Sequence, residues 1–178
     1  MSQNNWSGLV NRRLLCAKLA LSASLDVPSG TSNAIWSETQ CCAALLQLQT
    51  SFTAYLRELA ETYRCHSDTI GSTQELESSL ALGGKHPAEL IELLSLQDMP
   101  DSWLSHLLRA AAALPELLLG EGAKATNSSS SAAGTGMINV VQLDTGADEK
   151  LPSAEQLSQW LNLFEALIQR HRQSMVEV

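Results

Sequence analysis

The chain has 178 residues, a formal net charge of −8 and a hydrophobic content of 44%, which suits one domain that buries about two thirds of its unfolded surface. The acidic balance argues against sequence-independent binding of nucleic acid, because lysine and arginine make such contacts. No apolar run approaches the roughly 18 residues of a membrane span. We therefore expect a single helical domain over residues 1–178, without a membrane segment and without a nucleic-acid partner.

Residues 11–25, NRRLLCAKLALSASL, fit either an export signal with twin arginines or the first helix of a domain. Lys18 interrupts the apolar stretch, which is then shorter than the about 7 to 15 residues of a secretory signal. An amphipathic helix explains more of the residues, so we predict a core helix in a cytoplasmic protein with four reduced cysteines. The predicted buried stripe consists of Trp6, Val10, Leu14, Ala17, Leu21 and Leu25.

The next segment, after a turn predicted at DVPSGTSN, has the clearest helical pattern in the chain. Its apolar residues recur at steps of three and four, which predicts a long helix packed lengthwise on neighbours. Such a helix is not stable alone, because ordering each residue costs about 1 to 2 kcal/mol. The seam consists of Cys41, Leu45, Leu48, Phe52, Tyr55, Leu59 and Tyr63.

Two short helices are expected next. Ser72 and Glu75 have the spacing of a capping box, and Gly83 with Gly84 predicts the end of that helix. Pro87 predicts the start of the second short helix, through AELIELL.

A longer helix is predicted to start at Pro100 and to run to Gly120. Pro115 lies inside it and is expected to kink or split the helix, because proline removes one hydrogen bond and clashes one turn back. Residues 120–152 are rich in serine and glycine and predict a flexible linker or strap. Within them, residues 137–143 are β-prone and could pair with a second copy, bind a partner or lie across the bundle. We favour the strap.

Ser153 and Gln156 form a second predicted capping box, at the start of the last helix. The fold class is therefore all-α, four-helix-bundle-like, with one or two extra short helices and a long flexible Ser/Gly-rich insert before the last helix. The apolar face of that helix consists of Leu157, Trp160, Leu161, Phe164, Leu167, Ile168 and His171.

Motifs for metal binding and catalysis are weak. A di-iron bundle needs Glu-x-x-His pairs, and no histidine has a glutamate three residues before it. A zinc site from Cys41, Cys42, Cys65 and His66 is disfavoured because Cys41 and Cys42 point about 100° apart on one helix, and Cys65 lies far along that helix if it is continuous. GGKHP, at residues 83–87, lacks the strand that precedes a phosphate-binding loop. The basic residues RHR, at residues 170–172, lie in the last turn of a predicted helix, where the helix dipole favours cations, so they do not indicate a catalytic site. We expect no catalytic residue, no metal and no cofactor.

Tryptophans occur at the start of each main helix: Trp6, Trp36, Trp103 and Trp160. In an up-and-down bundle this spacing places two of them at each end of the core, where large rings with one polar edge fit well. The alternative is that some of them are exposed anchors for a partner.

The segments WSGLVNRRLLCAKLAL, LLQLQTSFTAYLRELAETY and LSQWLNLFEALIQRHRQSM resemble a family of small, uncharacterised all-helical bacterial proteins. The resemblance covers the helices and not the serine-rich insert. It implies a bacterial cytosolic helical domain, and it carries no activity and no site residues.

Two hypotheses of different class follow. The first is a non-enzymatic module that binds another protein or itself, indicated by the leucine-rich segments AELIELLSL and LPELLLG. The second is a small-molecule binder or hydrolase with a pocket between helices, which a buried, mutually hydrogen-bonded acid and base pair would favour. The polar candidates for that pocket are Arg57, Glu58, Glu61, His66, Arg109 and His171.

Overall fold

The computed structural model describes residues 5–124 and 151–176, and in these two stretches the chain forms six helices and no strand. Two helices are short, α3 (Thr73–Leu82) and α4 (Ala88–Asp98). None of the described helices combines the length and apolar content that crossing a bilayer requires. The predicted all-α class, with four main helices and two short ones, is confirmed. The four long helices are α1 (Trp6–Ala23), α2 (Asn33–Thr62), α5 (Trp103–Lys124) and α6 (Ala154–Val176).

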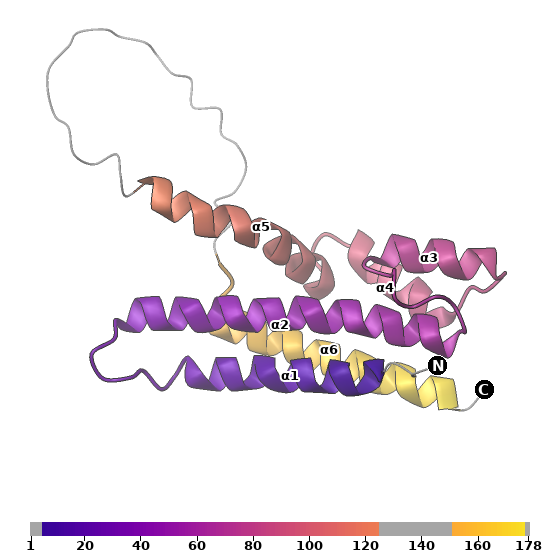
Figure 1. Ribbon diagram of the computed structural model, residues 1–178, viewed down its shortest axis with the longest axis horizontal. Helices are drawn as coiled ribbons and strands as arrows, with labels where there is room; N and C mark the ends of the chain where they lie inside the picture. The colour runs from indigo at the N-terminus through magenta and orange to yellow at the C-terminus, as the bar shows by residue number, and fades with distance from the viewer. Residues whose placement is uncertain (1–4, 125–150, 177–178) are drawn as a thin grey trace, which may run out of the picture.

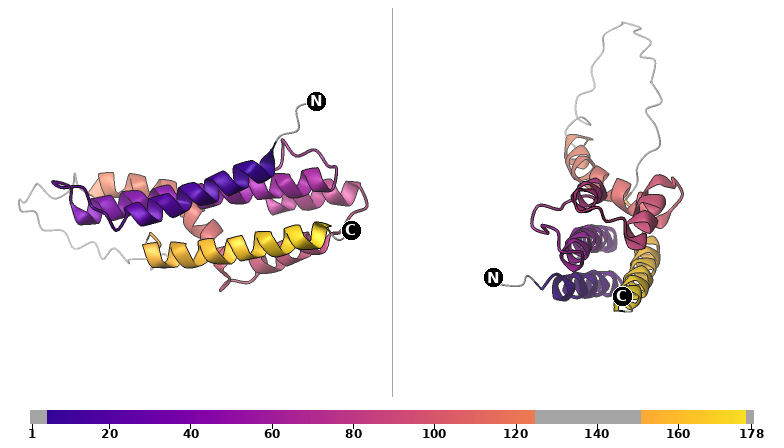
Figure 2. Two further views of the ribbon diagram at one scale, coloured as in Figure 1. Left: turned by 90° about the horizontal axis from the view of Figure 1, so that it is seen from below. Right: turned by 90° about the vertical axis from the view of Figure 1, so that its right-hand side faces the viewer.

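Helix α2 is the centre of the arrangement, because it contacts α1, α3, α5 and α6. α1 and α2 form an antiparallel pair along the long axis, and α6 runs beside them (Figure 1). α3 and α4 lie near the end of α2 (Figure 1). The end-on view places α1 and α5 on opposite sides, with α2 between them and α6 beside α1 (Figure 2).

The predicted seam of α2 faces the core. Leu45, Leu48 and Tyr55 are fully buried. Phe164 of α6 is also fully buried, and its ring packs against the rings of Phe52 and Tyr55 at centroid distances of 6.0 and 5.9 Å. Burial of each such side chain contributes about 1.5 to 3 kcal/mol. One connected hydrophobic core draws residues from all six helices.

Both predicted capping boxes are present. The Ser72 hydroxyl accepts a hydrogen bond from the backbone N–H of Glu75, and the Glu75 carboxylate accepts one from the backbone N–H of Ser72. Ser153 and Gln156 make the same exchange at the start of α6. These bonds involve residues three apart, so the local sequence is sufficient to predict them.

The predicted stripe of α1 is correct except at its end. Val10, Leu14, Ala17 and Leu21 are buried, but Leu25 is 86% exposed. The helix ends at Ala23, and the hydroxyl of Ser24 donates to the carbonyl of Leu21. Because the chain leaves the helix there, the helical spacing no longer decides where Leu25 points.

The predicted start of α5 at Pro100 is wrong by a few residues. The helix begins at Trp103, and the hydroxyl of Ser102 accepts a hydrogen bond from the backbone N–H of Ser105 at 3.0 Å. Serine satisfies a free N–H of the first turn, which proline does not do. Pro100 therefore lies in the turn before the cap.

Of the two outcomes predicted at Pro115, a kink or a split, the split is wrong, because α5 continues past it to Lys124. Proline removes one donor, and Ala111 and Leu114, in the turn before it, are buried in the core. The linker predicted over residues 120–152 thus starts too early, since Gly120 is still helical. Residues 125–150, including the strap predicted at 137–143, lie outside the described residues.

Candidate functional site

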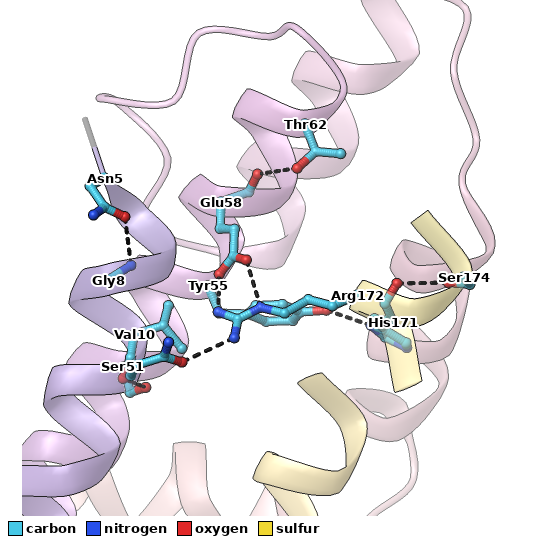
Figure 3. Close-up of polar contacts among 11 residues, drawn as sticks. Asn5, Gly8, Val10, Ser51, Tyr55, Glu58, Thr62, His171, Arg172 and Ser174 are labelled. Carbon is cyan, nitrogen blue, oxygen red and sulfur yellow. Dashed lines mark hydrogen bonds and ion pairs between the residues drawn. The ribbon is translucent and has the colours of Figure 1, made fainter. Parts of the chain in front are cut away.

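The most polar part of the core lies where α2, α4 and α6 meet. The hydroxyl of the fully buried Tyr55 lies 2.5 Å from Nδ1 of His171 (Figure 3). The other ring nitrogen of His171, Nε2, lies 2.9 Å from a carboxylate oxygen of Glu92. Because a carboxylate only accepts, Nε2 donates to Glu92. Both ring nitrogens of His171 therefore have a hydrogen-bond partner.

One turn further along α2, Glu58 forms a two-point ion pair with Arg172 of α6 (Figure 3). Nε and Nη2 of Arg172 donate to the two carboxylate oxygens, each at 2.8 Å. The third nitrogen, Nη1, donates to the side chain of Asn11 on α1 at 3.0 Å. The side chains of Glu58 and Arg172 are 11% and 27% exposed. This pair ties α6 to both α2 and α1.

Glu89 of α4 accepts hydrogen bonds from the hydroxyls of Tyr63 and Ser174, at 2.9 and 2.8 Å. Burial by itself would raise the pKa of the Glu89 carboxyl, but bonds from its own backbone N–H and from these two hydroxyls outweigh burial, and the pKa lies below its ordinary 4.5. Burial, and then the bond to Glu89, raise the pKa of Tyr63 to about 12. Glu89 is therefore held as a carboxylate and Tyr63 as a hydroxyl.

These contacts form one polar cluster, which we call the α6 anchor. Burial, and then the nearby carboxylates of Glu58 and Glu89, raise the pKa of Tyr55, so its hydroxyl stays protonated. Tyr55 is fully buried, and the His171 side chain is only 4% exposed. Groups so enclosed orient a helix well but offer little surface to a substrate. The anchor consists of Tyr55, Glu58, Tyr63, Glu89, Glu92, His171, Arg172 and Ser174.

Of the six polar candidates from the sequence, the structure brings Glu58 and His171 into the anchor, and these two do not bond to each other. Arg57 donates to the carbonyl of Ile70 and lies over the Trp6 ring. The remaining three are exposed and outside the anchor: Glu61, His66 and Arg109. The described residues therefore contain no bonded acid and base pair from that set.

Sequence reasoning missed Glu89, Glu92 and Arg172. The available signals were the spacing of three between Glu89 and Glu92 inside an apolar helix, and the place of Glu58 on the buried seam. The interpretation of RHR as a response to the helix dipole was incomplete. Arg170 pairs with Glu92 and Arg172 pairs with Glu58.

The zinc candidates lie apart, with Cys41 and Cys42 in the first half of α2 and Cys65 and His66 beyond its end. Across residues 5–124 and 151–176, no three His, Cys, Asp or Glu side chains are placed to hold a metal ion. The four cysteines are not paired with one another. Burial raises the pKa of the Cys41 thiol, which disfavours the nucleophilic thiolate.

A second feature is an open groove of about 660 Å³ between the α4 to α5 turn and the first turns of α6. We call it the aromatic groove. The ring of His106 stacks on Trp160 with an interplanar angle of 2°, and Trp103 packs on the buried Phe164 at 5.7 Å. The groove is lined mainly by Leu96, Met99, Trp103, His106, Trp160 and Leu163.

The four tryptophans divide into two kinds. All are half-buried, but the indole N–H of Trp6 donates to Ser67 and that of Trp36 donates to the carbonyl of Ala23. The indole N–H groups of Trp103 and Trp160 donate to no described residue. The predicted placement of two tryptophans at each end is wrong, because α5 starts beside α6 and brings Trp103 and Trp160 into one groove.

A comparison with known protein families shows to which family the chain belongs. A family model described as "Family of unknown function (DUF6586)" matches residues 1–178. The chain belongs to this family. Its description assigns no activity, so DUF6586 gives neither the α6 anchor nor the aromatic groove a role. No curated protein and no solved structure matches the chain.

Proposed function

We propose that this protein is a non-enzymatic interaction module that holds an apolar, basic helix of another polypeptide in the aromatic groove. The observation that carries the proposal is the pair of half-buried tryptophans, Trp103 and Trp160, whose indole N–H groups have no acceptor among the described residues. Neither indole nitrogen is among the buried polar atoms that lack a partner, so both reach solvent and a ligand can contact them, and tryptophan is enriched at the energetic centre of interfaces. Met99, which is 53% exposed, adds an adaptable apolar wall.

The charge around the groove supports a basic ligand. Asp101 lines the groove and makes no hydrogen bond or ion pair with a described residue. Asp98 precedes the lining residue Met99, and Glu155 lies one turn before the lining residue Gln159. The opposing cation is Arg109, which donates to the carbonyl of Pro100. Carboxylates outnumber cations here, so lysine or arginine beside the apolar anchor is attracted.

The alternative, a small-molecule binder or hydrolase, has weaker support because Glu58 and His171 are enclosed and bond to other partners. A groove of this size also suits a small ligand, but Asp101 and His106, the acid and the base of its lining, form no hydrogen bond with each other. We place the module in the cytoplasm, since no disulfide joins its cysteines, as is typical of proteins in reducing compartments. Its bacterial origin and its lack of a nucleic-acid partner stay predictions.

The experiment is a two-dimensional NMR titration that follows the four indole N–H signals, assigned with single Trp→Phe variants. The probe is a synthetic helical peptide with leucines four residues apart and flanking arginines. We expect the signals of Trp103 and Trp160 to move, while those of Trp6 and Trp36 stay in place as internal controls. The same peptide with glutamate in place of arginine should bind more weakly.

Two variants complete the test. Replacing both half-exposed groove residues, Met99→Ser with Leu163→Ser, should weaken peptide binding. Leu82→Ala, at an exposed leucine of α3 that does not line the groove, should not. The proposal fails if the signals of Trp103 and Trp160 do not move, or if all four signals move alike. Movement with a small apolar compound but not with the peptide would favour the alternative.

A further inference from the structure

The outer face of α1 carries apolar side chains that the bundle does not cover. Leu15 and Leu19 are 56% and 61% exposed, although they lie on the same helix as the buried Val10, Leu14 and Leu21. The two leucines are four residues apart and therefore lie one above the other on the helix surface. Arg12 is exposed beside them and has no ion pair with a described residue. We define the α1 face as Arg12, Leu15 and Leu19.

The charge of α1 differs from that of the whole chain. The helix contains three cations, Arg12, Arg13 and Lys18, and no acidic residue, whereas the chain carries −8. Lys18 is paired with Glu165 of α6, which leaves Arg12 as the exposed cation of the α1 face. Two α1 faces packed on each other would bring like charges together, which disfavours a symmetric contact. A surface with carboxylates around an apolar centre suits the α1 face better.

The aromatic groove is such a surface, with Asp98 and Asp101 beside an apolar lining. We propose that the groove of one copy receives the α1 face of a second copy, so that Leu15 and Leu19 enter between Met99, Trp160 and Leu163. This inference rests on the proposed function, because it names the helix that the groove holds. Apolar residues four apart are the usual anchors of a helix in a groove.

The contact is between copies and not within one. In the end-on view α1 and α5 lie on opposite sides of the bundle, with α2 between them (Figure 2). The buried stripe of α1 faces its own core, so the α1 face points outward. A contact that joins two different surfaces is head-to-tail, and it generates chains or rings instead of a closed symmetric pair. Two leucines and one arginine make a small interface, so we expect reversible, concentration-dependent association.

The test uses sedimentation velocity at increasing concentrations of the full chain. The face variant is Leu15→Ser with Leu19→Ser, and the groove variant is Met99→Ser with Leu163→Ser. All four residues are about half exposed, between 49% and 61%, so both variants should fold, which circular dichroism checks. Leu82→Ala, at a leucine that is 92% exposed elsewhere, is the control and should associate as the unchanged protein does.

We expect the unchanged protein to form species beyond a dimer and each variant to shift to monomer, with association weakened by about tenfold or more. An equimolar mixture of the two variants should form a one-to-one dimer and nothing larger, because each copy keeps one intact surface. Raising the salt concentration should weaken the association.

Three results would overturn the inference: a monomer at every concentration, a face variant that associates normally, or a mixture that forms no dimer. Its failure is separable from failure of the proposed function. If the indole signals of Trp103 and Trp160 still respond to the basic peptide while the protein stays monomeric, the groove binds a helix other than α1. If these signals do not respond either, the proposed binding of a helix in the groove is refuted as well.

Discussion

Removal of Arg172 from the α6 anchor should destabilise the fold much more than removal of its neighbour Arg170. The Arg172→Met variant leaves the Glu58 carboxylate, which is 11% exposed, without its two-point partner. An unpaired buried charge costs about 3 to 5 kcal/mol. Because Arg172 is itself 27% exposed, solvent replaces part of the lost interaction, and we expect a loss of about 2 to 3 kcal/mol.

Arg170→Met is the matched control. Arg170 and its partner Glu92 are 58% and 38% exposed, so their pair should contribute only about 0 to 1 kcal/mol. The assay is urea unfolding followed by circular dichroism at neutral pH. The double variant Glu58→Met with Arg172→Met should recover much of the lost stability, because no charge is then left buried. Equal losses at Arg170 and Arg172, or a double variant as unstable as Arg172→Met, would refute this reasoning.

Two further predictions concern acid stability and the core. Because the pKa of Glu89 is lowered in the folded state, its stabilisation is present above the ordinary 4.5 and is lost as the pH falls through the lowered value. Urea unfolding between about pH 7 and pH 3 should therefore depend less on pH in Glu89→Gln, and unchanged pH dependence relative to the exposed control Glu77→Gln would contradict the assignment. In the core, Leu48→Ala should lower the free energy of unfolding by about 2 to 5 kcal/mol, since Leu48 is fully buried. Leu82→Ala should change it by less than about 0.5 kcal/mol, and similar losses for both would show that Leu48 is not core.

The helices were predictable because their signals are local. The spacing of Leu45, Leu48 and Phe52 predicts the buried side of α2, and Ser72 with Glu75 predicts a helix start from residues three apart. The ends of α1 and α5 were harder to place. At Ser24 and Ser102 a single side-chain bond decides where the helix stops or starts, and the same residue type also occurs inside helices.

The sites were not predictable, because their residues are distant in sequence. Tyr55 and His171 are 116 positions apart, and His171 and Glu92 are 79 apart. The sequence marked Tyr55 and His171 as members of apolar faces, which is correct, but periodicity does not tell which polar atoms meet across helices. Trp103 and Trp160 share a groove only because α5 starts beside α6. The start of α5 is set by the helix cap that Ser102 forms, whereas the sequence pattern predicted that start at Pro100.

Helix α6 contributes residues to both the α6 anchor and the aromatic groove. The first turns of α6 supply Trp160 and Leu163 to the groove, and its last turns supply His171 and Arg172 to the anchor. Apolar contacts alone tolerate small rotations of a helix, whereas hydrogen bonds depend steeply on direction. The bonds from Tyr55 and Glu58 therefore fix the rotation of α6 about its own axis. That rotation sets which side of Trp160 faces Trp103, so the enclosed polar groups hold one side of the groove in place.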